Sequence, residues 1–385
     1  MTACTRASFA RPAVGGDRGT SDAWGVDAAT AAGTRGGGRR PNQDAFGMAF
    51  GVPQPGGLLV TVLDGHGPAG HFIARHVRDR LPAWVAACVG EAQNTPPPTP
   101  PKTPGGGGGN AATAVEPGGG AYRAGMNFTL NDATGAMHTC HGSDMPPLTA
   151  ALRRAYIALD EDLCAGRSTL LAASKVTPDT SGCCAVTALV LDDGTLLVAS
   201  CGDSSAFLAV SRSRSAGASS PTEAPYLVRP VSLAHKPSGA EATRIRLAGG
   251  RIGSIPNEEH ILRVWPSESS KDPGFGLAVA RAFGDVYWKP AGVCSTPDIV
   301  AKTIHPDDAF LVLCTDGVTD VMSPQEVVTC AGTALENRCN AGEAVLKAAE
   351  KAWADKWPKH TRDDITVAVL VLQPGLLLQG QEAGA

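Results

Sequence analysis

The stretch LLVTVLDGHG, from Leu58 to Gly67, is an apolar run that ends abruptly in an acid and an imidazole between glycines. An Asp-Gly pair after a strand is a common turn signal, so one interpretation is an ordinary turn with His66 facing solvent. A second apolar run, AFLVLCTDGVTD from Ala309 to Asp320, ends in the same way far down the chain. Two core strands that both end in carboxylates favour a shared site.

Composition limits the class of protein. The 385 residues are 43% hydrophobic, with a formal net charge of -4 and a pI near 6.1. This is enough for one large domain with disordered segments, and we expect a monomer. The charge gives no electrostatic reason to expect a nucleic acid or an anionic membrane as a partner. No apolar run reaches the roughly 18 residues that span a bilayer, so we expect no membrane association.

The cysteines and the N-terminus bear on the compartment. The 11 cysteines are scattered and show no C-x-x-C spacing, which is typical of reduced thiols in a cytoplasmic or nuclear protein. The N-terminus lacks a continuous apolar region and therefore does not predict a secretory signal peptide. It is free of acids up to Asp17 and rich in Ala, Ser, Thr and Arg, so import into an organelle is the alternative.

Order and disorder separate by composition. Residues 1–23 form a polar tail, and residues 94–147 contain TPPPTPPKTP and a run of glycines. Such segments bury too little apolar surface to offset chain entropy, so we expect a disordered N-terminal tail and a disordered insertion. One domain then extends over residues 24–375, with a C-terminal tail at 376–385.

Apolar patterning predicts an α+β fold. Helices are expected over residues 69–88, 148–164, 240–248, 324–335 and 343–357, with Pro82 as a candidate break. Hairpin-linked strands with helices between them favour an antiparallel sheet covered by helices over a parallel βαβ winding. The expected strands cover residues 58–63, 183–191, 195–200, 206–210, 226–233, 276–281, 310–314 and 365–372.

Aspartates recur at junctions between apolar strands and turns. Each alone is more typical of a turn former, but their repeated placement indicates one rim of a sheet. Converging carboxylates repel one another unless cations hold them, and oxygen ligands select hard ions such as Mg²⁺ or Mn²⁺. A two-ion site can deprotonate a bridging water for attack on phosphorus. The residues are Asp44, Asp64, Asp203, Asp285, Asp316, Asp320, Asp363 and Asp364.

A set of motifs in a fixed order carries a family resemblance. It resembles the metal-dependent serine/threonine phosphatases of type 2C, especially their plant-type members, from about residue 24 to 372. The resemblance implies a four-layer α+β fold, a β-sandwich of two antiparallel sheets flanked by helices, with a dinuclear metal centre at one end. The motifs are RPNQDAF, VLDGHG, SGCCAV, GDSSAFL, LAHKPSGAEATRIRLAGGRI, GLAVARAFGD, FLVLCTDGVTDVMSPQEVV and DDITVAVLVL.

The resemblance also implies the metal ligands, by motif position. Asp64 would bridge two ions, Mg²⁺ or Mn²⁺, and the carbonyl of Gly65 would bind one of them. Asp316 and Asp363 would bind the other ion. Asp203, together with Asp316, would hold a weaker third ion.

Three further residues receive roles from the resemblance. Asp44 would orient metal-bound waters, and Arg39 would grip the substrate phosphate with its planar fork of donors, with Arg40 as its rival. His66 would donate a proton to the departing Ser or Thr alkoxide. That role would explain why the strand ends in DGHG, although a solvent-facing histidine remains the alternative.

The implied function is hydrolysis of phosphoserine and phosphothreonine in phosphorylated protein substrates. Gln43 stands where many members have a glutamate ligand, which would weaken one ion site. One alternative is a pseudophosphatase that binds phosphoproteins without turnover, and the intact Asp64, Asp316 and Asp363 argue against it. The other alternative is a metallohydrolase of small phosphate esters.

Residues 254–275 lie at a position that resembles the family's flap beside the catalytic cleft. This polar segment contains Glu258 and Glu259. It either forms an ordinary surface loop or contacts the protein part of the substrate.

Overall fold

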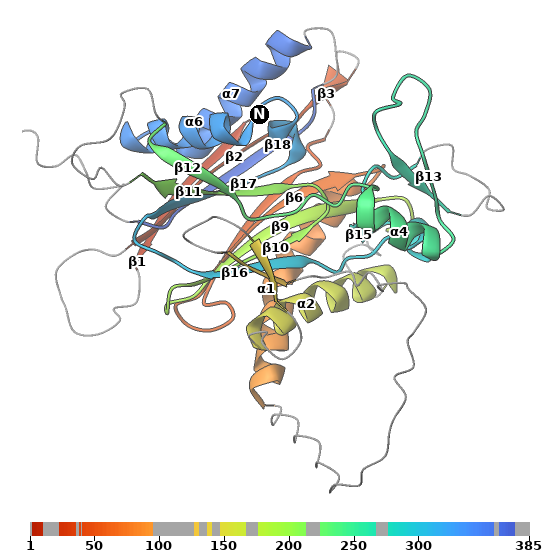
Figure 1. Cartoon of the computed structure of the whole chain (residues 1–385), viewed down its shortest axis with the longest axis horizontal. Helices are drawn as coiled ribbons and strands as arrows, with labels where there is room; N and C mark the ends of the chain where they lie inside the picture. Colours follow the sequence, from red (N-terminus) through yellow and green to blue (C-terminus); the bar gives the residue numbers. More distant parts are fainter. Residues whose placement is uncertain are drawn as a thin grey trace, which may run out of the picture.

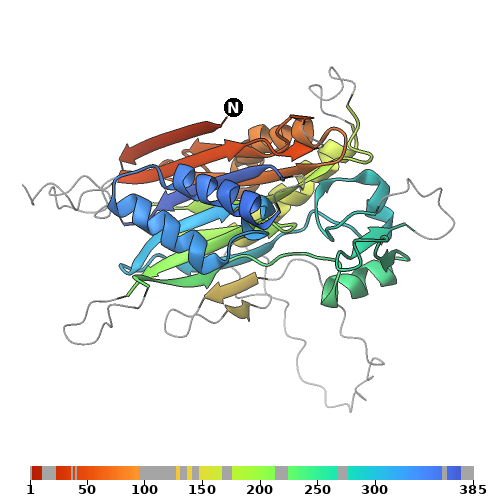
Figure 2. The ribbon, with the colours of Figure 1, turned by 90° about the horizontal axis from the view of Figure 1, so that it is seen from above.

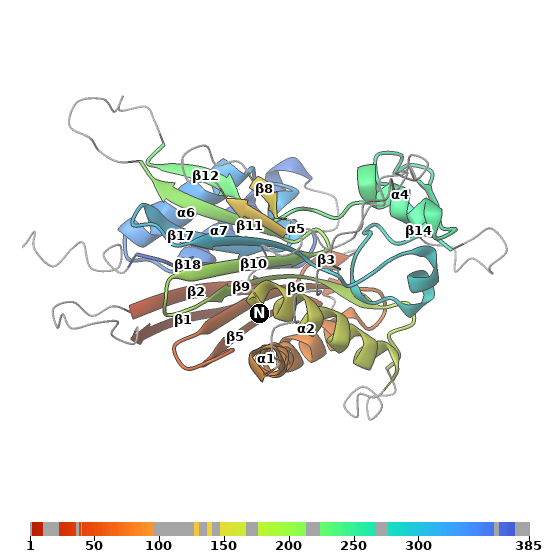
Figure 3. The same ribbon diagram turned by 60° about the horizontal axis from the view of Figure 1, so that its bottom comes forward.

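Two β-sheets pack face to face between two pairs of helices (Figures 1 and 3). The expected four-layer α+β sandwich of two antiparallel sheets flanked by helices is therefore confirmed, apart from one parallel strand pair. The structure, a computed structural model, describes residues 2–10, 23–35, 38–39, 41–94, 127–130, 137–140, 147–166, 176–212, 224–266, 276–357 and 362–373.

The first sheet has six strands in the order β1-β2-β18-β17-β11-β12, and all neighbours are antiparallel. Its central strands β18 and β17 are buried at every residue, because both of their faces are covered. This burial explains their continuous apolar sequences. The strands are β1 (Ala3–Ala10), β2 (Ala23–Ala31), β18 (Ile365–Val371), β17 (Asp308–Cys314), β11 (Ser205–Ser211) and β12 (Tyr226–Pro230).

The second sheet follows the order β5-β6-β9-β10-β16-β7-β8, and β15 pairs with the start of β9. The pair β16 and β7 is parallel, and the other pairs are antiparallel. The strands are β5 (Ala45–Phe50), β6 (Leu58–His66), β9 (Gly182–Val190), β10 (Thr195–Cys201), β16 (Asp298–Thr303), β7 (Asn127–Leu130), β8 (Met137–Cys140) and β15 (Phe283–Gly284).

Apolar side chains fill the space between the sheets, among them Val60 and Val186 from one sheet and Leu313 from the other. Helices α1 (Gly70–Asn94) and α2 (Pro147–Cys164) cover the outer face of the second sheet, and α6 (Pro324–Glu336) and α7 (Ala341–Lys356) cover the first. Helix α1 continues through Pro82, where packing of the fully buried neighbours on the sheet holds it. None of the described helices combines the length and apolar character needed to cross a membrane.

A smaller unit, here called the flap unit, lies beside one end of the sandwich (Figure 2). It has its own apolar core around the fully buried Trp288. Two short elements lie near the same end, the hairpin of β3 (Thr34–Arg35) and β4 (Gly38–Arg39) and the helix α5 (Asp316–Thr319). The flap unit consists of α4 (Gly239–Leu247), β13 (Arg251–Gly253), β14 (Arg263–Trp265) and the 3-10 helix η2 (Val286–Ala291).

Three local expectations from the sequence are wrong. Ala3–Ala10, placed in a disordered tail, forms β1 and pairs with β2 over eight positions, and the expected insertion contains β7 and β8. These strands gain their order from the backbone ladder of a neighbour, which composition does not reveal. Residues 276–281 form only isolated bridges at Leu277 and Arg281. The rest of the tail and insertion, and residues 376–385, lie outside the described residues.

Candidate metal centre

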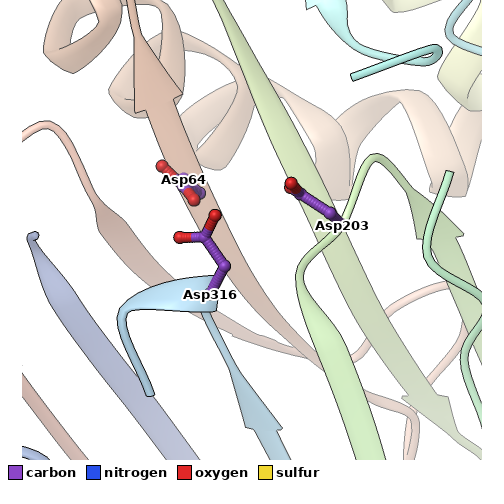
Figure 4. Close-up of side chains that lie close together, drawn as sticks. All are labelled: Asp64, Asp203 and Asp316. Carbon is purple, nitrogen blue, oxygen red and sulfur yellow. The ribbon is translucent and has the colours of Figure 1, made fainter. Parts of the chain in front are cut away.

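Three carboxylates meet at the end of the sandwich near the flap unit (Figure 4). Asp64, Asp203 and Asp316 each offer an oxygen within 4.8 Å of the others. Asp64 belongs to β6 of the second sheet, and Asp316 begins α5 directly after β17 of the first. Asp203 lies in the turn between β10 and β11. Both sheets therefore deliver an acid to one point, as the two apolar runs ending in Asp-Gly had indicated.

The three acids open into a cleft of about 640 Å³. Gly65, His66 and Asp363 line it too, so most of the residues expected at the site share one cavity. The opposite wall comes from the flap unit and the segment before η2, with Arg263, Leu277, Val279 and Trp288.

The electrostatics of this cluster are unfavourable without cations. Burial raises the pKa of Asp64 and of Asp316 well above the ordinary value, and repulsion from neighbouring acids raises both further. Burial alone would also raise the pKa of Asp203, but the ammonium of Lys236, ion-paired with it, lowers that pKa instead. Oxygen ligands that repel one another fit hard divalent cations such as Mg²⁺ and Mn²⁺.

Gly65 lies where the backbone is crowded. A β-carbon there would come within 2.4 Å of the Gln43 carbonyl oxygen and 2.6 Å of the Gly70 carbonyl oxygen, so only glycine fits. The side-chain amide of Gln43 donates a hydrogen bond to the Gly67 carbonyl, 2.7 Å away. Gln43 therefore secures the loop beside Asp64.

Asp44 and Asp363 hold different positions around the cluster. Asp44 is buried and accepts a hydrogen bond from Thr315 Oγ1 at 2.9 Å; burial, then repulsion by Asp364 and Asp363, raises its pKa. Asp363 lines the cleft but lies outside the group of three close carboxylates among the described residues. Its Oδ1 accepts a hydrogen bond from the Asp364 amide at 2.8 Å.

Arg39 is placed only by its backbone. It ends β4 and pairs with Thr34, whose amide donates to the carbonyl of Arg362 at 2.9 Å, next to Asp363. The hairpin is thus attached beside the cluster. The side chain of Arg39 and all of Arg40 lie outside the described residues, so the choice between these two arginines stays a prediction.

His66 contacts an acid that the sequence had not assigned to it. Its Nε2 donates a hydrogen bond to Oδ2 of Asp285 at 2.6 Å, since an ionised carboxylate only accepts. Burial disfavours the imidazolium, but the charge of Asp285 and its hydrogen bond outweigh burial and raise the pKa of His66 above 6.5. Asp285 had been counted among the acids at strand ends, but no local signal could pair two residues 219 positions apart.

Comparisons with known proteins agree with this geometry. Residues 140–363, more than half of the chain, match the family described as Protein phosphatase 2C. The chain is 32% identical to the rice "Probable protein phosphatase 2C 38", with 82% of this chain and 62% of that protein covered. It is 34% identical to the rice "Probable protein phosphatase 2C 12", with 86% of this chain and 78% of the relative covered. The chain thus spans less than two thirds of the first of these relatives.

A solved structure supports the fold. The serine-threonine phosphatase 2C from Toxoplasma gondii superposes with a TM-score of 0.64 at 18% identity, covering 96% of this chain and 99% of that one. Its two-sheet sandwich with flanking helices is the architecture described above. The family and sequence matches show that the chain belongs to the protein phosphatase 2C family.

Proposed function

We propose that this chain is a protein phosphatase that hydrolyses phosphoserine and phosphothreonine in phosphorylated proteins. The observation that carries the proposal is the group of Asp64, Asp203 and Asp316, whose oxygens lie within 4.8 Å of one another beside His66 in an open cleft. Members of the family are metal-dependent protein serine/threonine phosphatases, which supports this assignment. A pseudophosphatase would be expected to lack an acid of the metal core, and none is missing.

The proposal assigns the acids to two ions, Mg²⁺ or Mn²⁺. Asp64, the Gly65 carbonyl, Asp316 and Asp363 would hold these two ions. Asp203 would contribute to a third, weaker site, and its ion pair with Lys236 gives a physical reason for the weakness. When bound, such a pair of ions supplies an ionised water as nucleophile and offsets the charge on the phosphate.

The remaining roles belong to the chain's own groups. The guanidinium of Arg39 holds the phosphate oxygens, for which its planar donors are suited. Asp44, which accepts a hydrogen bond from Thr315, would orient waters at the ions. His66, with its raised pKa, gives a proton to the departing alkoxide, which is a poor leaving group without one.

The proposal extends to the partners, the oligomeric state and the location of the chain. We propose phosphorylated proteins as the substrates, a monomeric state, and a cytoplasmic or nuclear location. Size-exclusion chromatography with light scattering tests the monomer, and imaging of a C-terminally tagged chain tests the location.

Metal-dependent release of phosphate tests the function directly. With Mn²⁺ or Mg²⁺, the purified chain is expected to release phosphate from phosphoserine and phosphothreonine peptides. A chelator should abolish the release and added metal should restore it, while Asp316→Asn serves as the inactive control. Full activity in excess chelator would contradict the metal assignment. Activity on small aryl phosphates but on no peptide would contradict the protein substrate.

A further inference from the structure

His66 and Asp285 form an asymmetric pair at the edge of the cleft. The side chain of His66 is 28% exposed, whereas that of Asp285 is 0% exposed. A histidine side chain at a strand end can rotate among several rotamers, and one buried acceptor selects a single orientation of the ring. The contact uses Nε2, so Nδ1 is the ring nitrogen left for a substrate.

The backbone around Gly182 brings this pair together. Gly182 in β9 pairs with His66 in β6 on one side and with Gly284 in β15 on the other. A β-carbon at Gly182 would lie 2.3 Å from Oδ2 of Asp285, so any larger residue would displace the carboxylate. The absence of a side chain at Gly182 thus leaves room for the contact between the Asp285 carboxylate and the His66 imidazole.

Asp285 itself is held in an unusual conformation. Its φ of 53° and ψ of 44° are left-handed, which is uncommon for residues other than glycine, asparagine and aspartate. Its amide donates to the Ser181 carbonyl at 3.0 Å, and its carbonyl accepts from the Trp288 amide at 2.8 Å. Glycine would satisfy this backbone with less strain, so the turn alone does not require a carboxylate.

The carboxylate has little other use within the described part of the chain. Its Oδ1 is buried there without a hydrogen-bond partner, although it belongs to a residue that lines the cleft. Leaving a buried acceptor unpaired is unfavourable for folding. A role at the site explains why the acid is present.

We propose that Asp285 is a positioning residue for His66: its carboxylate fixes the imidazole ring so that Nδ1 is presented to the leaving oxygen of the substrate. The inference rests on the proposed phosphatase function. Asp285 does not touch the reacting atoms and acts through the histidine.

A double-mutant cycle on two substrates tests this role. On a phosphothreonine peptide, Asp285→Asn should lower kcat by about 10- to 100-fold, as loss of a partner that orients a functional histidine does. On p-nitrophenyl phosphate, whose leaving group needs no proton, the loss should stay below about threefold. In a His66→Gln background, the second substitution should change peptide kcat by no more than about twofold. Equal losses on both substrates, or an undiminished loss in the His66→Gln background, would overturn the proposal.

The residues that replace Asp285 are chosen so that the variants still fold. Asparagine and glycine both tolerate the left-handed backbone, so Asp285→Asn and Asp285→Gly should melt near the wild-type temperature. If Asp285→Asn unfolds, Asp285→Gly carries the same test.

A readout without turnover separates this inference from the proposed function. Long-range ¹H–¹⁵N spectra of the Mg²⁺-loaded protein, assigned with His66→Gln and recorded at a pH where the imidazole is neutral, should show His66 protonated at Nε2. Asp285→Gly should shift the His66 nitrogens towards a mixture of tautomers. Unchanged His66 nitrogen shifts in Asp285→Gly would overturn the positioning role. A wild-type chain that is inactive with every metal would refute the phosphatase and leave these spectra decisive.

Discussion

Two groups of buried carboxylates lie close together, and they differ in how far cations of the chain itself offset their charge. Glu241 and Asp298 surround the fully buried Arg281, with contacts of 2.6 Å from Nη2 to Oε1 and 2.9 Å from Nη1 to Oδ1. His235 adds a contact of 3.1 Å from its Nε2 to Asp298. Burial would raise the pKa of Asp298, but His235 and Arg281 lower it to about 2.

Among the side chains that the structure describes, neither Asp64 nor Asp316 of the metal-centre cluster forms an ion pair with a lysine or an arginine. There burial and mutual repulsion raise the pKa of Asp64 and Asp316. Lys236 forms an ion pair with Asp203 and offsets the rise at Asp316 only in part. The difference teaches that the fold supplies its own cation where an acid has a structural task. It leaves the acids uncompensated where a cation from solution is expected to bind.

The two groups are physically connected. The His235 amide donates to the Gly202 carbonyl at 2.9 Å, directly before Asp203, and Lys236 follows His235 in the chain. Glu241 belongs to α4 of the flap unit. The Arg281 network therefore holds the flap unit and the turn that carries Asp203 in one relative position.

The largest effect is expected from removing one acid of the metal-centre cluster. Asp316→Asn should lower kcat/KM on phosphopeptides by about 10³-fold or more, because several kcal/mol of metal-dependent stabilisation are lost. In chelator at neutral pH, the same variant should be at least as stable as wild type, since one of several repelling charges is gone. Urea unfolding in chelator measures this, and a clear loss of stability there would refute the idea of uncompensated acids.

In the Arg281 network, removal of a charge should instead destabilise the fold. Arg281→Met should lower the free energy of unfolding by about 3 to 5 kcal/mol, because it leaves buried acids without their cation. A matched control is Lys351→Met, which removes the exposed Lys351–Asp355 pair on α7 and should leave urea unfolding unchanged. Equal free energies of unfolding for the two variants would mean that the buried ion pairs do not stabilise the fold.

The stability contributions of the two groups should change in opposite directions with pH. The folded pKa of Asp298 is about 2, below the unfolded value of about 3.9, so its stabilisation is present above the unfolded value and is lost as pH falls towards 2. The stability difference between wild type and Asp298→Asn should therefore shrink as the pH is lowered from about 6 to about 3. Asp316 has a raised pKa, so in chelator its contribution is favourable at low pH and is lost as pH rises. Parallel pH profiles for Asp298→Asn and Asp316→Asn would contradict this.

The sequence predicts the parts of this comparison that are local. Strands buried on both faces and aspartates at their ends are visible as short patterns, so an antiparallel sheet covered by helices and a group of acids at one rim could be predicted. The four layers and the individual ligand assignments came from the family resemblance of the ordered motifs. The network of Arg281 could not, because its partners come from separate segments. The apolar pattern of residues 276–281 suggested a strand, whereas Arg281 is held by side-chain ion pairs and the Ala280 amide bonds to the His235 carbonyl at 2.8 Å. The contact of His66 with Asp285 depends on strand pairing in the same non-local way.

The smallest expected effect concerns an ion pair of intermediate exposure at the mouth of the cleft. Arg263 in β14 lines the cleft, donates to the Gly276 carbonyl at 3.1 Å and contacts Glu258 at 2.6 Å. Glu258 is 41% exposed, so this pair is weaker than the buried ones, and its acid can be removed without unfolding the protein. Glu259 instead accepts a hydrogen bond from the Asn257 amide and provides the control.

Removing Glu258 should release the guanidinium of Arg263 towards the substrate. Glu258→Ala is therefore expected to raise the rate on phosphopeptides with acidic flanks, relative to neutral ones, by about two- to fivefold, the scale of a half-exposed ion pair. Glu259→Ala should leave that ratio unchanged, and neither variant should alter the rate on p-nitrophenyl phosphate, because that substrate presents no flanking charge. The measurement is kcat/KM over a peptide set that differs only in flanking charge. If Glu258→Ala keeps the wild-type rank order and spread, the pair only supports the flap unit, and substrate selection must come from another part of the cleft.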